Sequence, residues 1–184
     1  MQAISGAGYP GVSAIDIVDN IVPYISGEEP KLEAEPLKIL ASLSTDKTRF
    51  EDRDIKISAT CNRVPVIDGH TECVSLSFKN RPAPDIEQVL EALSTFKTGL
   101  EHIKDQLPSY PPSPIVVKTE NDRPQPKLDR NNGGGQAITV GRVRQCPILD
   151  VRFTLLLHNT VLGAAGSSIL NAEVAVARGY IKSI

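Results

Sequence analysis

The sequence is poor in aromatic residues and contains no tryptophan. Its 184 residues include four Tyr, four Phe and one Met, and the aromatic fraction is only 4%. The hydrophobic fraction of 40% therefore depends on Ile, Val, Leu and Ala, which predicts an aliphatic core but does not decide the fold. The length suits one domain, or one domain with a long insertion, and is sufficient to bury a core.

Other absences exclude classes of partner. The formal net charge is −2 and no basic block is present, which argues against nucleic acid and against an anionic membrane surface. No apolar run reaches the length of a transmembrane helix, and residues 1–20 lack the pattern of a secretion signal. Three cysteines (Cys61, Cys73 and Cys146) do not make a disulfide framework. We therefore expect a cytoplasmic protein.

Apolar periodicity predicts a mixture of helices and strands. Residues 12–26 suggest a short helix and a loop, and 28–42 a helix whose continuous part begins near Glu35, with Pro36 in its first turn. Residues 108–136 are rich in proline and glycine, which predicts a long loop with one possible short strand at 115–118. The other expected elements are strands at 54–63, 70–78, 138–144 and 149–158, and helices at 85–98 and 163–178, the last closed by Gly179.

The order of these elements favours one fold class. Strands and helices come in clusters and not in strict alternation, so we expect an α+β fold with helices packed on one face of a mostly antiparallel mixed sheet. The whole chain, 1–184, is expected to form one domain carrying a loop insertion at about 108–136.

Arg63 and His70 interrupt apolar strand faces and are the first candidates for chemistry. Six residues separate them, so the two strands could pair antiparallel with both side chains near one end of the sheet. Arginine binds carboxylate or phosphate through two parallel hydrogen bonds, and histidine transfers protons near neutral pH. Together they suit an anionic substrate. The alternative is a strand end with a partly buried histidine.

Two glycine-rich stretches and the cysteines leave alternatives open. Residues 5–8 and 159–166 could allow a cofactor to approach the backbone closely, or could simply form a tight turn and a close helix–sheet contact. Cys73 and His70 lie three apart on an expected strand and should face opposite ways, which disfavours a Cys–His pair. Cysteine and histidine spacing does not suit a metal site, and we expect none.

The segments together resemble the second domain of aspartate-semialdehyde dehydrogenases, in the branch found in fungi and archaea. The matching pieces span almost the whole chain in the family's order: QAISGAGYPG at 2–11, DNIVPYI at 19–25, EAEPLKIL at 33–40, RVPVIDGHTECVSLSF at 63–78, VGRVR at 140–144 and HNTVLGAAGSSILNAE at 158–173. The resemblance implies the C-terminal catalytic and dimerisation domain of a fold similar to glyceraldehyde-3-phosphate dehydrogenase. It also implies a homodimer or homotetramer.

This family reduces β-aspartyl phosphate with NADPH to aspartate semialdehyde and phosphate, toward threonine, methionine and lysine. By position, the resemblance implies that His70 is the acid/base and Arg63 binds the substrate carboxylate. Glu35 would bind the substrate amino group, Lys38 the phosphate, and Gln2 the acyl intermediate. The implied contacts to the nicotinamide of NADP come from Ser5, Gly6, Gly8 and Asn159.

One part of the family pattern is missing from this sequence. The family's nucleophile lies in a Ser-Asn-Cys motif shortly before QAISG, and no cysteine in the chain has that context. We therefore expect a truncated chain without the N-terminal Rossmann domain and without activity by itself. Two alternatives remain: a non-catalytic α+β dimerisation module, or a related enzyme such as N-acetyl-glutamyl-phosphate reductase or glyceraldehyde-3-phosphate dehydrogenase.

Overall fold

A computed structural model describes residues 14–181 of the chain. Its centre is a four-stranded sheet with the order β3-β6-β5-β4. The strands are β3 (His70–Leu76), β4 (Ile115–Lys118), β5 (Ile138–Gln145) and β6 (Val151–Leu157). β6 pairs antiparallel with both β3 and β5, whereas β4 runs parallel to β5. The expected mostly antiparallel, mixed sheet is confirmed.

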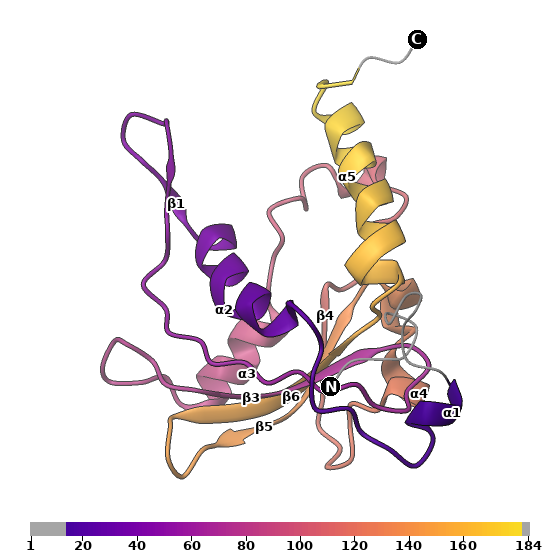
Figure 1. Cartoon of the computed structure of the whole chain (residues 1–184). Helices are drawn as coiled ribbons and strands as arrows, with labels where there is room; N and C mark the ends of the chain where they lie inside the picture. The colour runs from indigo at the N-terminus through magenta and orange to yellow at the C-terminus, as the bar shows by residue number, and fades with distance from the viewer. Residues whose placement is uncertain (1–13, 182–184) are drawn as a thin grey trace.

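The three longer helices lie on one side of this sheet (Figure 1). They are α2 (Glu28–Ile39), α3 (Ile86–Ser94) and α5 (Gly166–Ala177), and α5 continues from a π-helical turn at Val161–Ala165. Two short helices, α1 (Ala14–Ile17) and α4 (Pro126–Asp129), lie at one end of the sheet (Figure 1). A small hairpin of β1 (Ser42–Leu43) and β2 (Phe50–Glu51) projects from the end of α2. The α+β arrangement with helices on one face is thus confirmed.

Local sequence explains α3 well. Asp85 caps its first turn by accepting from the Gln88 backbone N–H at 2.8 Å, and the Gln88 side chain accepts from the Asp85 N–H at 3.0 Å. This reciprocal pair satisfies backbone donors that a helix start otherwise leaves without partners. The helix then packs against β4 and β5.

The predicted strand at 54–63 is wrong, and so is its pairing with the strand at 70–78. β3 pairs with β6, while residues 54–62 belong to no strand, and Arg63 forms an isolated bridge with Val22. Two N–H groups of this segment donate to carboxylates of α2: Ala59 N to Glu33 at 2.9 Å and Cys61 N to Glu29 at 2.8 Å. The alternating residues therefore form an extended segment, and helix carboxylates accept hydrogen bonds from two of its backbone N–H groups.

The same contacts explain why α2 begins earlier than expected. It is continuous from Glu28 through Pro36, because Glu29 and Glu33 in its first half are fixed by the extended segment. The predicted start near Glu35 is therefore wrong. Tertiary hydrogen bonds outweigh the helix-starting preference of proline at this position.

The predicted loop at 108–136 contains more regular structure than expected. It contains the expected strand β4, but also α4 and a 3₁₀ turn, η3 (Asn132–Gly135). A buried carboxylate, Asp129, holds this region together by accepting from the Arg123 side chain, from Gln125 N at 2.7 Å and from Asn132 Nδ2 at 3.4 Å. Asn132 also donates to buried Thr139 of β5 at 2.9 Å, which ties the segment to the sheet.

Candidate active site

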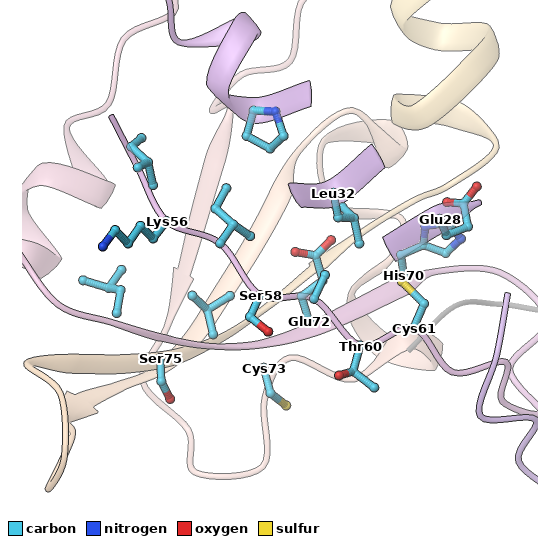
Figure 2. A pocket seen from close by; sticks show the side chains of 16 residues that line it. Glu28, Leu32, Lys56, Ser58, Thr60, Cys61, His70, Glu72, Cys73 and Ser75 are labelled. Atoms are coloured by element: carbon cyan, nitrogen blue, oxygen red, sulfur yellow. The ribbon is translucent and has the colours of Figure 1, made fainter. Parts of the chain in front are cut away.

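His70 is the first residue of β3 and faces a cavity between the sheet and α2 (Figure 2). The cavity measures about 560 Å³ and is bounded by α2, the extended segment 55–61 and β3. Figure 2 shows His70 beside Glu28 and Cys61 at one end, with Lys56 and Ser75 toward the other. His70 therefore forms part of the wall of this cavity.

The environment of His70 favours a neutral imidazole. Burial, together with the positive charge of Arg63, lowers the pKa of His70 below its ordinary value of 6.5, and the charge of Glu28 opposes this only in part. Its Nε2 atom is buried and has no hydrogen-bond partner among the described residues. Buried polar atoms almost always find partners, so this nitrogen bonds something outside the described residues.

Arg63 is buried, at 6% exposure, and lies near enough to His70 to affect its charge state. Its backbone exchanges two hydrogen bonds with Val22, at 2.8 and 3.0 Å, which fixes it on the strand-like bridge before β3. The structure thus brings Arg63 and His70 into one electrostatic environment, although by a different backbone route from the predicted hairpin.

Glu35 and Lys38 do not line the His70 cavity. Three residues of α2 line that cavity, and they share one helix face because they are spaced four apart: Glu28, Leu32 and Pro36. Glu35 and Lys38 line a separate hollow with Ile39 and Phe50. The roles implied for Glu35 and Lys38 stay predictions. Gln2, Ser5, Gly6 and Gly8 lie outside the described residues.

Asn159 follows β6 and accepts a hydrogen bond from Gly69 N at 2.8 Å, directly before His70. Arg130, at the end of α4, donates from Nη1 to the Asp68 carbonyl at 3.2 Å. Sequence reasoning missed Arg130 altogether. No local pattern points to it, because the contact joins residues 62 apart in the chain.

The stretch after Asn159 offers an open backbone. Gly163 is exposed, and a Cβ added to it would find no neighbouring atom nearer than 3.9 Å. Ala164 and Ala165 are exposed as well, so small side chains border Asn159 on an accessible surface. Small side chains therefore leave the surface of this turn accessible.

The described part of the chain lacks the features of two other kinds of site. Residues 14–181 contain no group of three or more His, Cys, Asp and Glu side chains placed to hold a metal ion. Within the same range, no helix combines the length and the apolar character that crossing a membrane requires.

Comparison with known proteins identifies the class of protein to which this fold and site belong. The sequence model of the family described as "Semialdehyde dehydrogenase, dimerisation domain" matches residues 1–162, so the chain belongs to that family. Its curated relatives are more specific. The chain is 55% identical over 184 residues to the aspartate-semialdehyde dehydrogenase of Trichophyton rubrum, and 53% identical over 185 residues to that of Saccharomyces cerevisiae.

These matches cover 98% of this chain but 50% of each relative, so the chain spans about half the length of the curated relatives it matches. Among solved structures, the aspartate-semialdehyde dehydrogenase of Candida albicans with NADP matches with a TM-score of 0.88 at 49% identity. The match covers 98% of this chain and 50% of the Candida albicans chain. A Vibrio cholerae enzyme complexed with ASA matches with a TM-score of 0.70 at 25% identity, over 98% of this chain and 53% of that one.

Proposed function

We propose that this chain is the part of an NADP-dependent aspartate-semialdehyde dehydrogenase that supplies the acid/base histidine and the substrate-binding arginine. The reaction is the reductive dephosphorylation of β-aspartyl phosphate to aspartate semialdehyde in amino-acid biosynthesis. The observation that carries the proposal is that His70 lines a cavity and lies close enough to buried Arg63 for the guanidinium charge to lower its pKa.

The proposed role of His70 follows from its protonation state. A lowered pKa keeps the imidazole neutral near pH 7, so that Nε2 can accept a proton from a reacting group and later return it. A module that served only for dimerisation would gain nothing from a partly buried titratable ring beside a buried arginine, since burial penalises the charged form of the ring. This favours the catalytic over the purely structural alternative.

The proposed role of Arg63 follows from its burial. A guanidinium removed from water forms stronger charge-assisted hydrogen bonds, and two parallel ones fit a carboxylate. Aspartate semialdehyde carries such a carboxylate. By family likeness, we also propose that Glu35 binds its amino group, Lys38 the phosphate, and Gln2 the acyl group.

NADP would supply the hydride-transfer chemistry when bound. The residues present suit its nicotinamide end, because Asn159 carries a side-chain amide beside the open, small-residue surface at 163–165. We propose that Asn159 meets the carboxamide, and that Ser5, Gly6 and Gly8 line the same pocket. The rest of the cofactor would be held by the remaining half of the protein.

Assembly and location complete the proposal. The family match describes a dimerisation domain, so the chain belongs to a protein that associates with itself. We propose a homodimer or homotetramer, in the cytoplasm, with a small-molecule substrate and neither nucleic acid nor membrane as partner.

Steady-state kinetics of the full-length protein that contains this chain would test the two central roles. His70→Asn should lower kcat by roughly 10²–10⁴-fold with little change in KM, because general acid–base catalysis contributes about that much. Arg63→Leu should instead raise KM for aspartate semialdehyde. Arg63→Lys keeps the charge but loses the two parallel N–H donors, so its KM should lie between those of the unaltered protein and Arg63→Leu. Unchanged kinetics in either variant would contradict the role proposed for that residue.

A further inference from the structure

We infer that Asn159 and Arg130 are positioning residues that fix the Asp68–Gly69 peptide group, one residue before His70, and thereby help to orient its imidazole at the cavity wall. This inference rests on the proposed function for its kinetic consequence, but its structural part can be tested without any enzyme activity. Holding this peptide is a role for Asn159 distinct from a contact to the cofactor.

Both hydrogen bonds end on one peptide group. Asn159 Oδ1 accepts from the N–H of Gly69 at 2.8 Å, and Arg130 Nη1 donates to the carbonyl of Asp68 at 3.2 Å. That N–H and that carbonyl belong to the same bond, between Asp68 and Gly69, and a peptide group is planar. Side chains from two distant parts of the chain therefore hold the plane at both of its ends, which leaves it a single orientation.

The backbone at Gly69 is also enclosed on its flanks. Gly69 is buried, and its φ of +114° is a conformation that side-chain-bearing residues rarely adopt. A Cβ built on it would lie 3.1 Å from Leu156 Cδ1 and 3.3 Å from Pro126 Cβ. Atoms of β6 and α4 thus pack against this position, so neither rotation nor displacement of the peptide is free.

His70 is the next residue, and its ring depends on this backbone. No described residue bonds its Nε2, so the orienting contacts seen among the described residues reach His70 through the backbone. An acid/base nitrogen must lie within hydrogen-bond reach of the reacting group, and a displacement of about 1 Å can cost about 100-fold in rate. The clamp on the peptide at 68–69 supplies that placement from the backbone side.

The kinetic test uses the full-length protein with matched variants. Asn159→Ala and Arg130→Met should each lower kcat about 10- to 100-fold with KM for aspartate semialdehyde nearly unchanged. Arg130→Lys keeps a donor and Asn159→Asp keeps an acceptor, so each should recover part of the loss. Arg178→Met and Asn80→Ala, both on exposed residues, serve as controls and should leave kcat unchanged.

A double variant examines whether the two residues act on one element. If both hold the same peptide, releasing either end suffices, and the Asn159→Ala/Arg130→Met pair should be little slower than the worse single variant. Independent roles would instead multiply the two losses. A multiplied loss would overturn the shared clamp.

A structural readout on the 184-residue chain separates this inference from the proposed function. The Gly69 amide should show slow hydrogen exchange in the unaltered chain and faster exchange in Asn159→Ala and Arg130→Met, with the His70 ring resonances displaced in both. If the unaltered full-length protein lacked dehydrogenase activity, the proposed function would fail. The exchange measurement would still show whether Asn159 and Arg130 hold the Asp68–Gly69 peptide.

The remaining outcomes are equally decisive. A Gly69 amide and a His70 ring left unperturbed by both variants would overturn the inference. So would an Asn159→Ala variant that only raises KM for NADP while the Gly69 amide exchanges as before, because Asn159 would then act on the cofactor alone.

Discussion

His70 combines two properties that folding alone does not favour: a titratable ring partly removed from water, and a neighbouring positive charge of the same sign as its own protonated form. Both lower the pKa of His70, with burial contributing most. The neutral form is the one that a proton acceptor needs. Protonating His70 therefore costs free energy in the folded state, so acid should destabilise the fold at this residue.

The pH dependence of stability should report this cost. Because the folded pKa lies below the unfolded value of 6.5, the unfolded chain binds more protons at His70 in that window. The free energy of unfolding should therefore decrease as pH falls below about 6.5 and through the folded pKa. Denaturant unfolding between pH 5 and 8 should show a shallower slope for His70→Gln, and an identical slope would contradict the lowered pKa.

Gly69→Ala should destabilise the chain by about 1–3 kcal/mol, since it combines backbone strain at positive φ with the contacts to Leu156 and Pro126. Gly99→Ala is the matched control, because Gly99 has a φ of +80° but no atom within 4 Å of an added Cβ. The difference between the two, measured by urea unfolding, isolates the crowding at Gly69. Equal losses would show that the packing around Gly69 is loose.

At the scale of elements, α4 is the least conspicuous helix in the sequence, yet it borders the site. It has four residues and owes its place to buried Asp129, which receives hydrogen bonds from Arg123 and from Gln125 N. The hydrogen bonds from Arg123 and the charge beside them lower the pKa of Asp129, which therefore stays ionised. Arg130, which donates to the Asp68 carbonyl, follows this helix, and Pro126, which would crowd a side chain at Gly69, begins it.

Arg123→Met should therefore be costly, by about 3–5 kcal/mol, because it leaves a buried carboxylate without its cation. Lys79→Met is the control: it breaks an ion pair with Asp54 in which both side chains are more than 70% exposed, and such pairs contribute about 0–1 kcal/mol. Thermal or urea unfolding of both variants gives the comparison. Equal, small losses would mean that Asp129 finds other partners.

Elements with a strong period could be predicted from sequence, and elements fixed by distant partners could not. The stripe of Ile86, Val89, Leu90 and Leu93 and the cap at Asp85 specify α3 locally. The alternation at 54–62 was equally clear, but its donors at Ala59 and Cys61 are satisfied by α2 instead of a strand. In the site, Arg63 and His70 stood out as polar residues on apolar faces, whereas Arg130 depends on a contact across 62 residues.

At the scale of the molecule, large apolar side chains lie exposed at one end of α2. On the end of α2 and on the hairpin beyond it, Ile39 is 77% exposed and Phe50 60%, with Leu40 and Leu43 also exposed. Contiguous apolar surface of this kind is typical of a contact with other protein. This agrees with the family's description as a dimerisation domain.

We expect the chain to associate in solution. Light scattering should give a mass near twice the 19.9 kDa of one chain, or a higher multiple, and a net charge of −2 opposes association little. Exchanging Ile39 and Phe50 for Ser tests whether that surface contributes. A single-chain mass at every concentration would contradict the expectation.

The chain by itself should not reduce NADP to NADPH when aspartate semialdehyde and phosphate are supplied. Cys61 is buried with a raised pKa, caused chiefly by burial, which disfavours the thiolate that a nucleophile needs. Backbone hydrogen bonds from Ile148 and Leu149 lower the pKa of Cys146. However, Cys146 follows the last residue of β5, at the end of the sheet where β6 begins and where Leu76 ends β3. That end lies about 20 Å from His70 at roughly 3.3 Å per strand residue. Turnover above background would show that a nucleophile has been overlooked.

The two hydrogen bonds at the peptide before His70 also set the order in which the site can form. They join it to residues 62 and 90 positions later in the chain. During synthesis at about 5–20 residues per second, His70 emerges roughly 5–20 s before Asn159. Until then the histidine has neither its backbone anchor nor β6, the strand beside it. A nascent chain that ends before Asn159 therefore cannot form both hydrogen bonds at the Asp68–Gly69 peptide.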